Sequence, residues 1–278
     1  MYAVSPLRYP GAKWRLNAFV EGLLRKNDLL DGHYIEPFAG GASLALGLLY
    51  RQAVNEIHLN DLDRALYAFW HSAVNHAEEF ATRVEQTDVD VEEWYRQKEV
   101  QANKPLADLF DLGFSTFFLN RTNRSGILDA GVIGGKEQTG KWKINARFNK
   151  AELAHRIRRI GSHRTQIHVT CSDAVDLLAQ LGPDLDEKSF VYLDPPYFVK
   201  GQGLYLNAYK PDDHSALRDA VLEHLDGPWM VSYDDVPEIR KLYRGLRKRE
   251  HCLNYSAASR REGREVLFFA PDIKIPTL

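Results

Sequence analysis

The chain has 278 residues, of which 44% are hydrophobic and 27% are charged, and its formal net charge is −2. This composition is ordinary for a globular protein, and the length supports a sizeable core without disulfide or metal staples. The longest apolar run, residues 42–50, is too short to span a bilayer, and the N-terminus lacks an apolar signal core. We expect a soluble, cytoplasmic protein built as one large domain or as a core domain with an insert.

Strand-like and helical patterns alternate along most of the chain. The strand-like runs occupy 33–37, 55–59, 166–171, 189–193, 229–233, 248–254 and 265–270. Helical patterns follow several of them, at 43–52, 173–181, 212–226 and 235–246. The alternation predicts an α/β protein with a mainly parallel sheet, and the two final runs predict an antiparallel C-terminal hairpin.

The alternation is interrupted between residues 63 and 160. Helical patterns at 63–85, 91–101 and 105–118 precede a segment rich in Gly, Lys and Arg. These features predict an inserted helical module that carries a basic hairpin or loop.

Charge is distributed unevenly despite the near-neutral total. Residues 121–164 carry eleven Lys or Arg against three acids, and residues 240–264 carry nine against two. Residues 78–111 carry ten acids and four bases. Two basic blocks on a balanced chain suit a surface that faces phosphates, although solvated helix faces would give the same pattern.

The two cysteines, Cys171 and Cys252, both have apolar, β-branched or aromatic neighbours in the sequence. We expect buried free thiols in a reducing compartment. No metal site is predicted.

A glycine-rich turn, residues 36–43, directly follows the first strand-like run and opens a helix. Glycine lets backbone amides approach a ligand closely, and a helix N-terminus favours anionic groups. Asp61 lies at the end of the next strand, about 20 positions on, where an acid can accept hydrogen bonds from ribose hydroxyls. The alternative for both is structural, a tight turn and a helix cap; Asp63 is the better cap, which leaves Asp61 for a ligand. Together they indicate a cofactor of the adenosine type.

The sequence Asp194-Pro195-Pro196-Tyr197 ends another strand-like run. Two prolines make a rigid extended turn without backbone donors. The Asp194 carboxylate and the Pro195 carbonyl can then accept hydrogen bonds from one amino group, and the Tyr197 ring offers a face for a planar base. Stacking on an aromatic ring contributes roughly 1–3 kcal/mol, which offsets part of the cost of taking a base out of a duplex. This motif indicates methylation of an amino group.

With these motifs in the same order, nearly the whole chain resembles the Dam-type (alpha-group) adenine-specific DNA methyltransferases. The resemblance implies a Rossmann-like methyltransferase sheet with S-adenosyl-L-methionine as cofactor, and catalysis by Asp194, Pro195, Pro196 and Tyr197. The residues matched to cofactor contacts are Tyr9, Lys13, Glu36, Phe38, Ala39, Gly40, Gly41, Asp61, Asp173 and Asp194. One departure is that the second glycine of the family's turn is Ala42 here, which leaves the backbone of the turn open.

The inserted segment resembles the family's target-recognition region at residues 118–126 and 146–149, while residues 131–143 differ, so a different target sequence is expected. The predicted DNA-binding residues are Asn120, Arg121, Asn123, Arg124, Lys136, Lys141, Lys143 and Arg147. Arg and Asn suit phosphates or base edges, and the lysines and Arg147 are assigned to phosphates.

The sequence therefore predicts a catalytic domain of residues 1–62 and 161–278 with a target-recognition domain of residues 63–160. The expected reaction is methyl transfer to the 6-amino group of a flipped-out adenine in double-stranded DNA, without a membrane partner. A related enzyme acting on RNA and a catalytically inactive DNA-binding protein are the alternatives. A homodimer and a cognate restriction endonuclease are left open.

Overall fold

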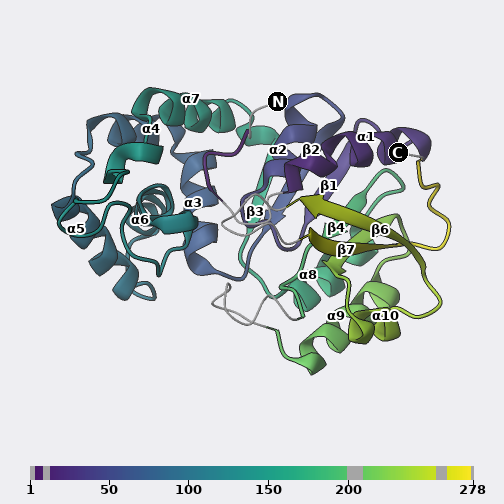
Figure 1. The fold of residues 1–278 in the computed structure, drawn as a ribbon. Helices are drawn as coiled ribbons and strands as arrows, with labels where there is room; N and C mark the ends of the chain where they lie inside the picture. The colour runs from purple at the N-terminus through teal and green to yellow at the C-terminus, as the bar shows by residue number, and fades with distance from the viewer. Residues whose placement is uncertain (1–3, 9–12, 199–208, 255–261, 277–278) are drawn as a thin grey trace.

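The computed structural model describes residues 4–8, 13–198, 209–254 and 262–276 (Figure 1). The described chain contains one sheet of seven strands, in the order β3-β2-β1-β4-β5-β7-β6. Its strands are β1 (Gly32–Glu36), β2 (Val54–Asn60), β3 (Ile167–Thr170), β4 (Phe190–Leu193), β5 (Trp229–Asp234), β6 (Arg247–Asn254) and β7 (Glu262–Phe269). Strands β1 to β5 are parallel, whereas β7 runs antiparallel between β5 and β6. This topology confirms the predicted mainly parallel sheet with an antiparallel C-terminal hairpin.

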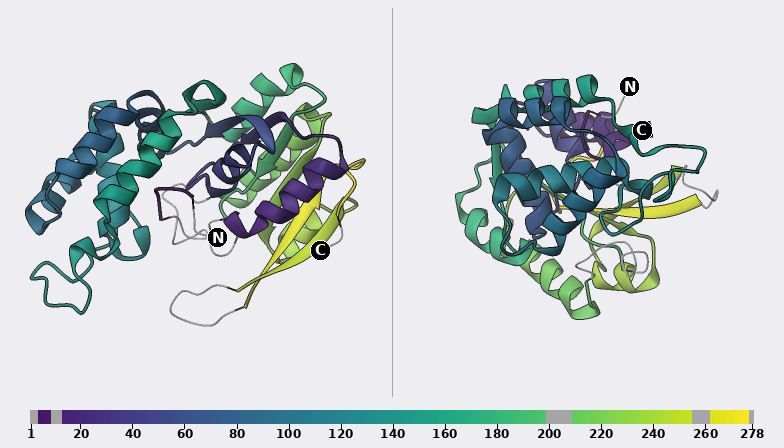
Figure 2. Two further views of the ribbon diagram at one scale, coloured as in Figure 1. Left: turned by 90° about the horizontal axis from the view of Figure 1, so that it is seen from above. Right: turned by 90° about the vertical axis from the view of Figure 1, so that its left-hand side faces the viewer.

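Helices cover both faces of the sheet, because its strands carry apolar side chains on both sides (Figure 2). On one face lie α1 (Asn17–Lys26), after a 3₁₀ turn at Lys13–Leu16, and α2 (Ser43–Tyr50). On the other face lie α8 (Ala174–Leu181), α9 (Pro211–His224) and α10 (Pro237–Leu242). The sheet and these helices make the Rossmann-like core that the sequence predicts.

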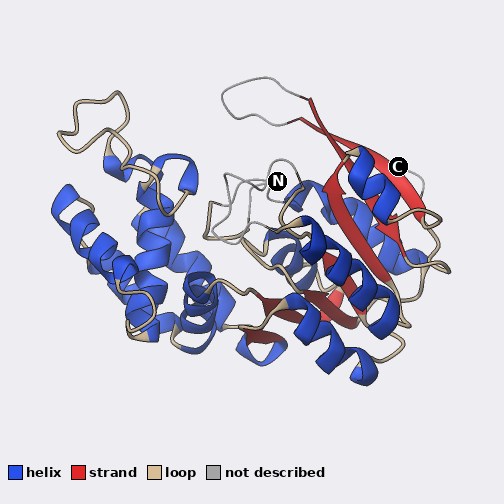
Figure 3. Ribbon diagram, turned by 90° about the horizontal axis from the view of Figure 1, so that it is seen from below, coloured by secondary structure: helices blue, strands red, loops and turns tan. Residues whose placement is uncertain are grey.

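The insert leaves the sheet after β2 and returns to it at β3, the edge strand. It is helical and lies to one side of the sheet (Figure 3). Its helices are α3 (Arg64–Asn75), α4 (Ala77–Gln86), α5 (Val91–Ala102), α6 (Leu109–Thr122) and α7 (Lys150–Gly161). Three of these helices have an aspartate as N-cap. Asp63, Asp90 and Asp108 each accept hydrogen bonds from backbone N–H groups in the first turn. The apolar cluster that fills the insert continues into the cluster under α1 and α2.

Three details of the insert differ from the sequence prediction. The helix expected over 63–85 is two helices, because the backbone of His76 leaves helical geometry at φ −128°. Helix α6 starts four residues later than expected, at Leu109, since Asp108 caps it. Helix α7 was not predicted, and the basic segment before it is a loop with 3₁₀ turns at Arg124–Gly126 and Ile144–Arg147.

The prediction of buried thiols is wrong for Cys171, which is exposed. It directly follows β3, the edge strand, so no neighbouring strand covers it on that side. The side chain of Cys252 lies outside the described residues. Within the described chain, no helix combines the length and apolar character needed to cross a membrane.

Candidate active site

The glycine-rich turn joins β1 to α2 at the carboxyl edge of the parallel strands. Gly40 and Ala42 both adopt positive φ, +46° and +43°, so Ala42 keeps the left-handed backbone that glycine would adopt most easily. The indole N–H of Trp70, from α3, donates to the Gly40 carbonyl at 2.9 Å and supports the turn. The substitution of alanine for the expected glycine therefore leaves the turn intact.

Asp61 follows β2 and reaches across to the same turn. Its carboxylate accepts the Gly40 N–H at 3.0 Å and the Asp63 N–H at 2.9 Å. Asp63 instead caps α3 by accepting the Ala65 N–H, as the sequence indicated. Burial raises the pKa of Asp61 to about 6.

Asn60, which the sequence analysis missed, ties three strand ends together. Its fully buried side chain donates to the carbonyls of Pro37 and Ser172, both at 2.9 Å, and accepts the Thr170 hydroxyl at 2.8 Å. An asparagine at the end of a strand carries both donors and acceptors for such a role, which is the signal that would have found it.

Two further predicted cofactor residues border this edge. Asp173, after β3, accepts the Val175 N–H and so begins α8. The ring of Phe38 lies edge-to-face with that of Tyr209, with centroids 5.9 Å apart. Tyr9 lies outside the described residues.

The residues at this edge fit S-adenosylmethionine by the chemistry of their side chains. Glu36, Asp61, Asp173 and Asp194 end or follow four neighbouring strands. Carboxyl oxygens accept hydrogen bonds from ribose hydroxyls and amino groups, and those that are ionised complement a sulfonium and an ammonium. Glu36 is buried, accepts from the Tyr34 hydroxyl and the Ala45 N–H, and has its pKa raised to about 8 by burial.

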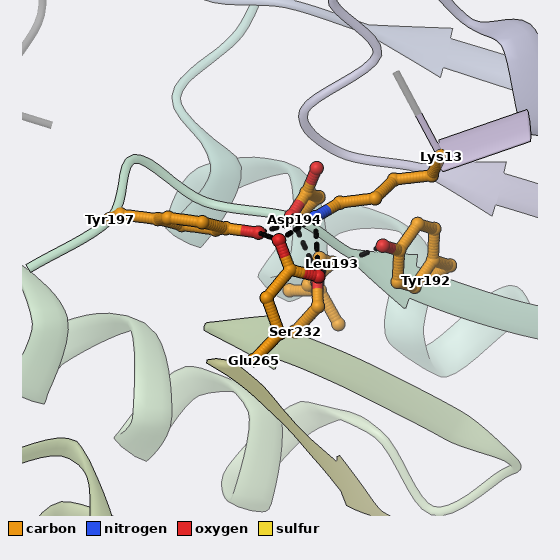
Figure 4. A network of polar contacts seen from close by, with 7 residues as sticks. All are labelled: Lys13, Tyr192, Leu193, Asp194, Tyr197, Ser232 and Glu265. Atoms are coloured by element: carbon orange, nitrogen blue, oxygen red, sulfur yellow. Dashed lines mark hydrogen bonds and ion pairs between the residues drawn. The ribbon is translucent and has the colours of Figure 1, made fainter. Parts of the chain in front are cut away.

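The Asp194–Tyr197 segment leaves β4 beside the turn, and the side chains of Asp194 and Tyr197 enter one polar network (Figure 4). The Asp194 carboxylate accepts the Ser232 hydroxyl at 2.6 Å and pairs with the Lys13 ammonium at 3.2 Å. Tyr197 donates its hydroxyl to Glu265 and accepts from Lys13. The Lys13 ammonium also lies 4.9 Å from the centre of the Tyr197 ring.

Two members of this network, Glu265 and Ser232, were missed from the sequence. Glu265, on β7, is fully buried and accepts Lys13 at 3.0 Å through both carboxylate oxygens. Ser232, on β5, bonds Tyr192 as well as Asp194. No local motif marks either residue, because each enters the site through strand pairing with a distant part of the chain.

Charges in the network compete. Burial raises the pKa of Asp194, and the Glu265 charge raises it further, whereas Lys13 lowers it. Burial alone would lower the pKa of Lys13, but the carboxylates of Asp194 and Glu265 raise it above its ordinary value. Lys13 is therefore charged and holds the two acids together.

Two predicted DNA-binding residues are buried and serve the insert itself. The Asn120 amide accepts the Arg8 N–H at 2.7 Å and donates to the carbonyls of Arg8 and Gly126. Asn123 accepts the Trp94 indole N–H at 2.7 Å and donates to Ile127 and Leu128. The prediction that these two residues contact DNA directly is corrected, because their side-chain amides are buried and form hydrogen bonds within the protein.

The basic residues of the loop have a different setting. Arg124, Lys136, Lys141, Lys143 and Arg147 are exposed, whereas Arg121 is half-buried and donates to the carbonyls of Arg147 and Pro6. Lys143 also donates to the Gln138 carbonyl at 2.6 Å.

Trp142, which the sequence analysis missed, lies between two of these lysines and is 64% exposed. The Lys141 ammonium is 5.8 Å from the centre of its ring. An exposed aromatic ring among cations suits stacking on a nucleic-acid base.

Comparisons with known proteins identify a family and relatives that this chain resembles. Residues 9–258 match the model of the D12 class N6 adenine-specific DNA methyltransferase family. The Type II methyltransferase M.MjaIII of Methanocaldococcus jannaschii is 23% identical over 257 residues, which are 87% of this chain and 80% of that protein.

Solved structures that match part of this chain include a SAM dependent methyltransferase from Agrobacterium tumefaciens and the rRNA methyltransferase aviRa from Streptomyces viridochromogenes. They have TM-scores of 0.42 each, identities of 9% and 15%, and cover 92% and 94% of this chain. The alignment spans 62% of the Agrobacterium chain, less than two thirds of its length, and 85% of the Streptomyces chain.

Proposed function

Because the chain belongs to the D12 class N6 adenine-specific DNA methyltransferase family, we propose that Asp194 and Tyr197 hold the target adenine during transfer. Members of this family methylate the 6-amino group of adenine in DNA, and S-adenosylmethionine is the methyl donor. The observation that carries the proposal is the convergence of Asp194, Tyr197 and Lys13 beside the glycine-rich turn. When bound, the cofactor supplies a methyl group activated by its positive sulfur.

The residues of the chain then act on the adenine. The Asp194 carboxylate and the Pro195 carbonyl accept hydrogen bonds from the amino group, which directs the nitrogen lone pair toward the methyl group. Pro196 keeps the turn rigid, and the Tyr197 ring stacks on a base that has left the duplex. The amino group loses its proton after it becomes positively charged, so no strong base is required.

We assign Lys13 a specific task in this scheme. Its ammonium pairs with the Asp194 carboxylate in the described conformation, at the position where we place the adenine amino group. An incoming adenine would replace this contact, while Glu265 continues to hold the ammonium through both oxygens. Until the substrate arrives, the Lys13 charge thereby opposes the rise in the pKa of Asp194 that burial causes.

We assign cofactor binding to Tyr9, Lys13 and the side chains at the strand ends. Glu36, Asp61, Asp173 and Asp194 supply acceptors, Phe38 packs beside the cofactor, and Ala39, Gly40 and Gly41 allow close approach of the backbone. The division into a catalytic domain, 1–62 and 161–278, and a recognition domain, 63–160, is supported by the exit of the chain after β2 and its return at β3.

We assign the DNA contacts of the recognition domain to its exposed cations and to Arg121. Arg124, Lys136, Lys141, Lys143 and Arg147 lie on the same loop segment before α7. A cognate restriction endonuclease is proposed as a functional partner because a relative is a Type II methyltransferase. A homodimer is a further proposal, which the mass of the protein in solution tests.

The first test is transfer of labelled methyl from S-adenosylmethionine to unmethylated DNA, followed by nucleoside analysis and methylation-sensitive sequencing. We expect 6-methyladenine within one short sequence. An RNA substrate in the same assay tests the RNA alternative. The proposal would be overturned if the labelled methyl group were transferred to RNA and not to DNA.

The mechanism is tested by Asp194→Ala, which removes one of the two acceptors of the amino group. Transfer should fall roughly 100-fold or more, as when a group that stabilises a transition state is lost. Asp226→Ala, at an exposed position, is the matched control and should keep full activity. A folded Asp194→Ala variant with normal turnover would disprove the assigned role.

A further inference from the structure

Four arginines meet where the N-terminal segment crosses the insert. Arg8 belongs to that segment, Arg121 to α6, Arg147 to the turn before α7, and Arg156 to α7 itself. Three of these side chains donate to backbone carbonyls: Arg121 to those of Arg147 and Pro6, Arg156 to that of Ser5 at 3.0 Å, and Arg8 to that of Asn123 at 3.1 Å. The segment runs beside α7 in Figure 1, in agreement with these bonds.

The cluster is short of negative charge. Within the described part of the chain, no carboxylate forms an ion pair with Arg8, Arg121 or Arg147, and only Arg156 has one, with Glu152. Burial and the charges of Arg8, Arg156 and Arg147 lower the pKa of Arg121 to about 9. Like charges held this close repel one another, and an anion bound between them would relieve the repulsion.

The protein fixes this arrangement with buried contacts. Asn120 bonds both the N–H and the carbonyl of Arg8. Gly126, at φ +78°, lets the Arg8 carbonyl approach so closely that an added Cβ would lie 2.3 Å from it. The backbone that carries Arg8 is thus anchored to the insert, and the guanidinium groups of Arg8, Arg121 and Arg156 are each held by a backbone carbonyl.

We propose that Arg8, Arg121, Arg147 and Arg156 form one binding site for a phosphodiester of the DNA backbone. Guanidinium groups match phosphate oxygens through paired, charge-assisted hydrogen bonds, and the three side chains already held by carbonyls lose little entropy on binding. The inference rests on the proposed function and adds Arg8 and Arg156 to it. Lys13 lies five residues after Arg8, so the same segment joins the phosphate site to the catalytic network.

The test measures DNA binding and its salt dependence for Arg8→Gln and Arg147→Gln. Each variant should bind DNA roughly tenfold more weakly, to a similar extent on target and non-target sequences. The slope of log affinity against log salt should become less negative by about 0.9 for a lost phosphate contact. Cofactor affinity, measured without DNA, should stay unchanged.

Controls separate this site from general charge effects. Arg164→Gln removes an exposed arginine next to β3 at the opposite, amino-terminal edge of the sheet and should change neither quantity. Arg147→Lys keeps the charge and should retain the salt slope.

Two results would overturn the proposed phosphate site. One is DNA affinity and salt dependence equal to those of the wild type in both Arg8→Gln and Arg147→Gln. The other is a loss of DNA affinity in Arg164→Gln as large as in these two variants. Wild-type protein that neither binds nor methylates DNA would instead overturn the proposed function, and this site with it.

Discussion

Glu265 shows how a side chain outside every recognisable motif can control the catalytic residues. It is fully buried and accepts hydrogen bonds from both Lys13 and Tyr197. A carboxylate in this position fixes the direction of the lysine and of the tyrosine hydroxyl at the same time. We regard it as a positioning residue, since it acts on the substrate only through these two neighbours.

Replacement of Glu265 by Gln is expected to lower turnover roughly 10- to 100-fold, because small misplacements of reacting groups carry costs of that size. The Glu265 charge helps to raise the pKa of Lys13, so its loss should lower that pKa and move the alkaline limb of the pH–rate profile to lower pH. Turnover as a function of pH measures both effects. The matched control is Glu238→Gln, because the Glu238 side chain is exposed on α10. A reduced rate with an unmoved alkaline limb would argue for a merely structural role.

At the scale of elements, the turn between β1 and α2 places an alanine where the backbone favours glycine. Ala42 has φ +43° and ψ 30°, a left-handed conformation that costs an alanine about 1–2 kcal/mol. The turn tolerates this cost because Trp70 and Asp61 bond Gly40, two residues before it. The conformation is set by the surrounding contacts and not by the local sequence.

Replacement of Ala42 by Gly should therefore relieve strain. Ala45→Gly is the matched control: Ala45 is also buried but lies inside α2, where glycine costs about 1 kcal/mol. We expect the Ala42 variant to be the more stable of the two by about 1–2 kcal/mol in urea unfolding. Equal losses of stability in both variants would show that Ala42 is not strained.

The sequence predicted the strands well because most strand-like runs are short, rich in apolar or β-branched residues and bounded by polar residues, although the run at 248–254 is mainly polar. It predicted α4 and α6 less well, because a polar residue within a helical pattern does not show by itself that a helix is interrupted there, as at His76, or begins after it, as at Asp108. Helix α7 was missed because its abundant Lys and Arg suggested a solvated loop. In the structure, its apolar side Leu153, Ala154, Ile157 and Ile160 packs into the core of the insert.

At the scale of the whole molecule, two buried groups on neighbouring strands link stability to pH in opposite directions. Burial raises the pKa of Glu36, on β1, to about 8. Its contribution to the free energy of unfolding is therefore full below its pKa in the unfolded chain, 4.5, and is lost as pH rises through 8. Burial and the nearby His33 and His168 lower the pKa of His58, on β2, to about 4. The contribution of His58 to the free energy of unfolding is full above its pKa in the unfolded chain, 6.5, and is lost as pH falls through 4.

The melting temperature of the wild-type protein should thus decline toward both ends of the range from pH 4 to 8.5. Glu36→Gln should flatten the alkaline decline, and His58→Gln should flatten the acidic decline. Glu79→Gln, at an exposed position, should leave both limbs unchanged. An alkaline limb in the Glu36 variant that parallels the wild type would disprove the first assignment.

The motifs of the candidate site could be predicted because the fold brings the carboxyl ends of parallel strands to one edge. Each motif follows its own strand, so local sequence carried the signal. Glu265, Ser232 and Arg8 could not be predicted, since their contacts depend on strand order and on how the N-terminal segment crosses the insert. The same distant contacts explain why Asn120, assigned to DNA from its motif, holds the chain together instead.

The anchoring of Arg8 to the insert has a consequence for how new target specificity could be acquired. An insert that leaves after one strand and returns at its neighbour resembles a cassette that recombination can exchange. Here the cassette has a detached second piece, because residues 5–8 fit against Asn120, Gly126 and Arg156. A chimaera that inherits a foreign insert but keeps its own first residues would lose this fit, so productive exchange should carry both pieces together.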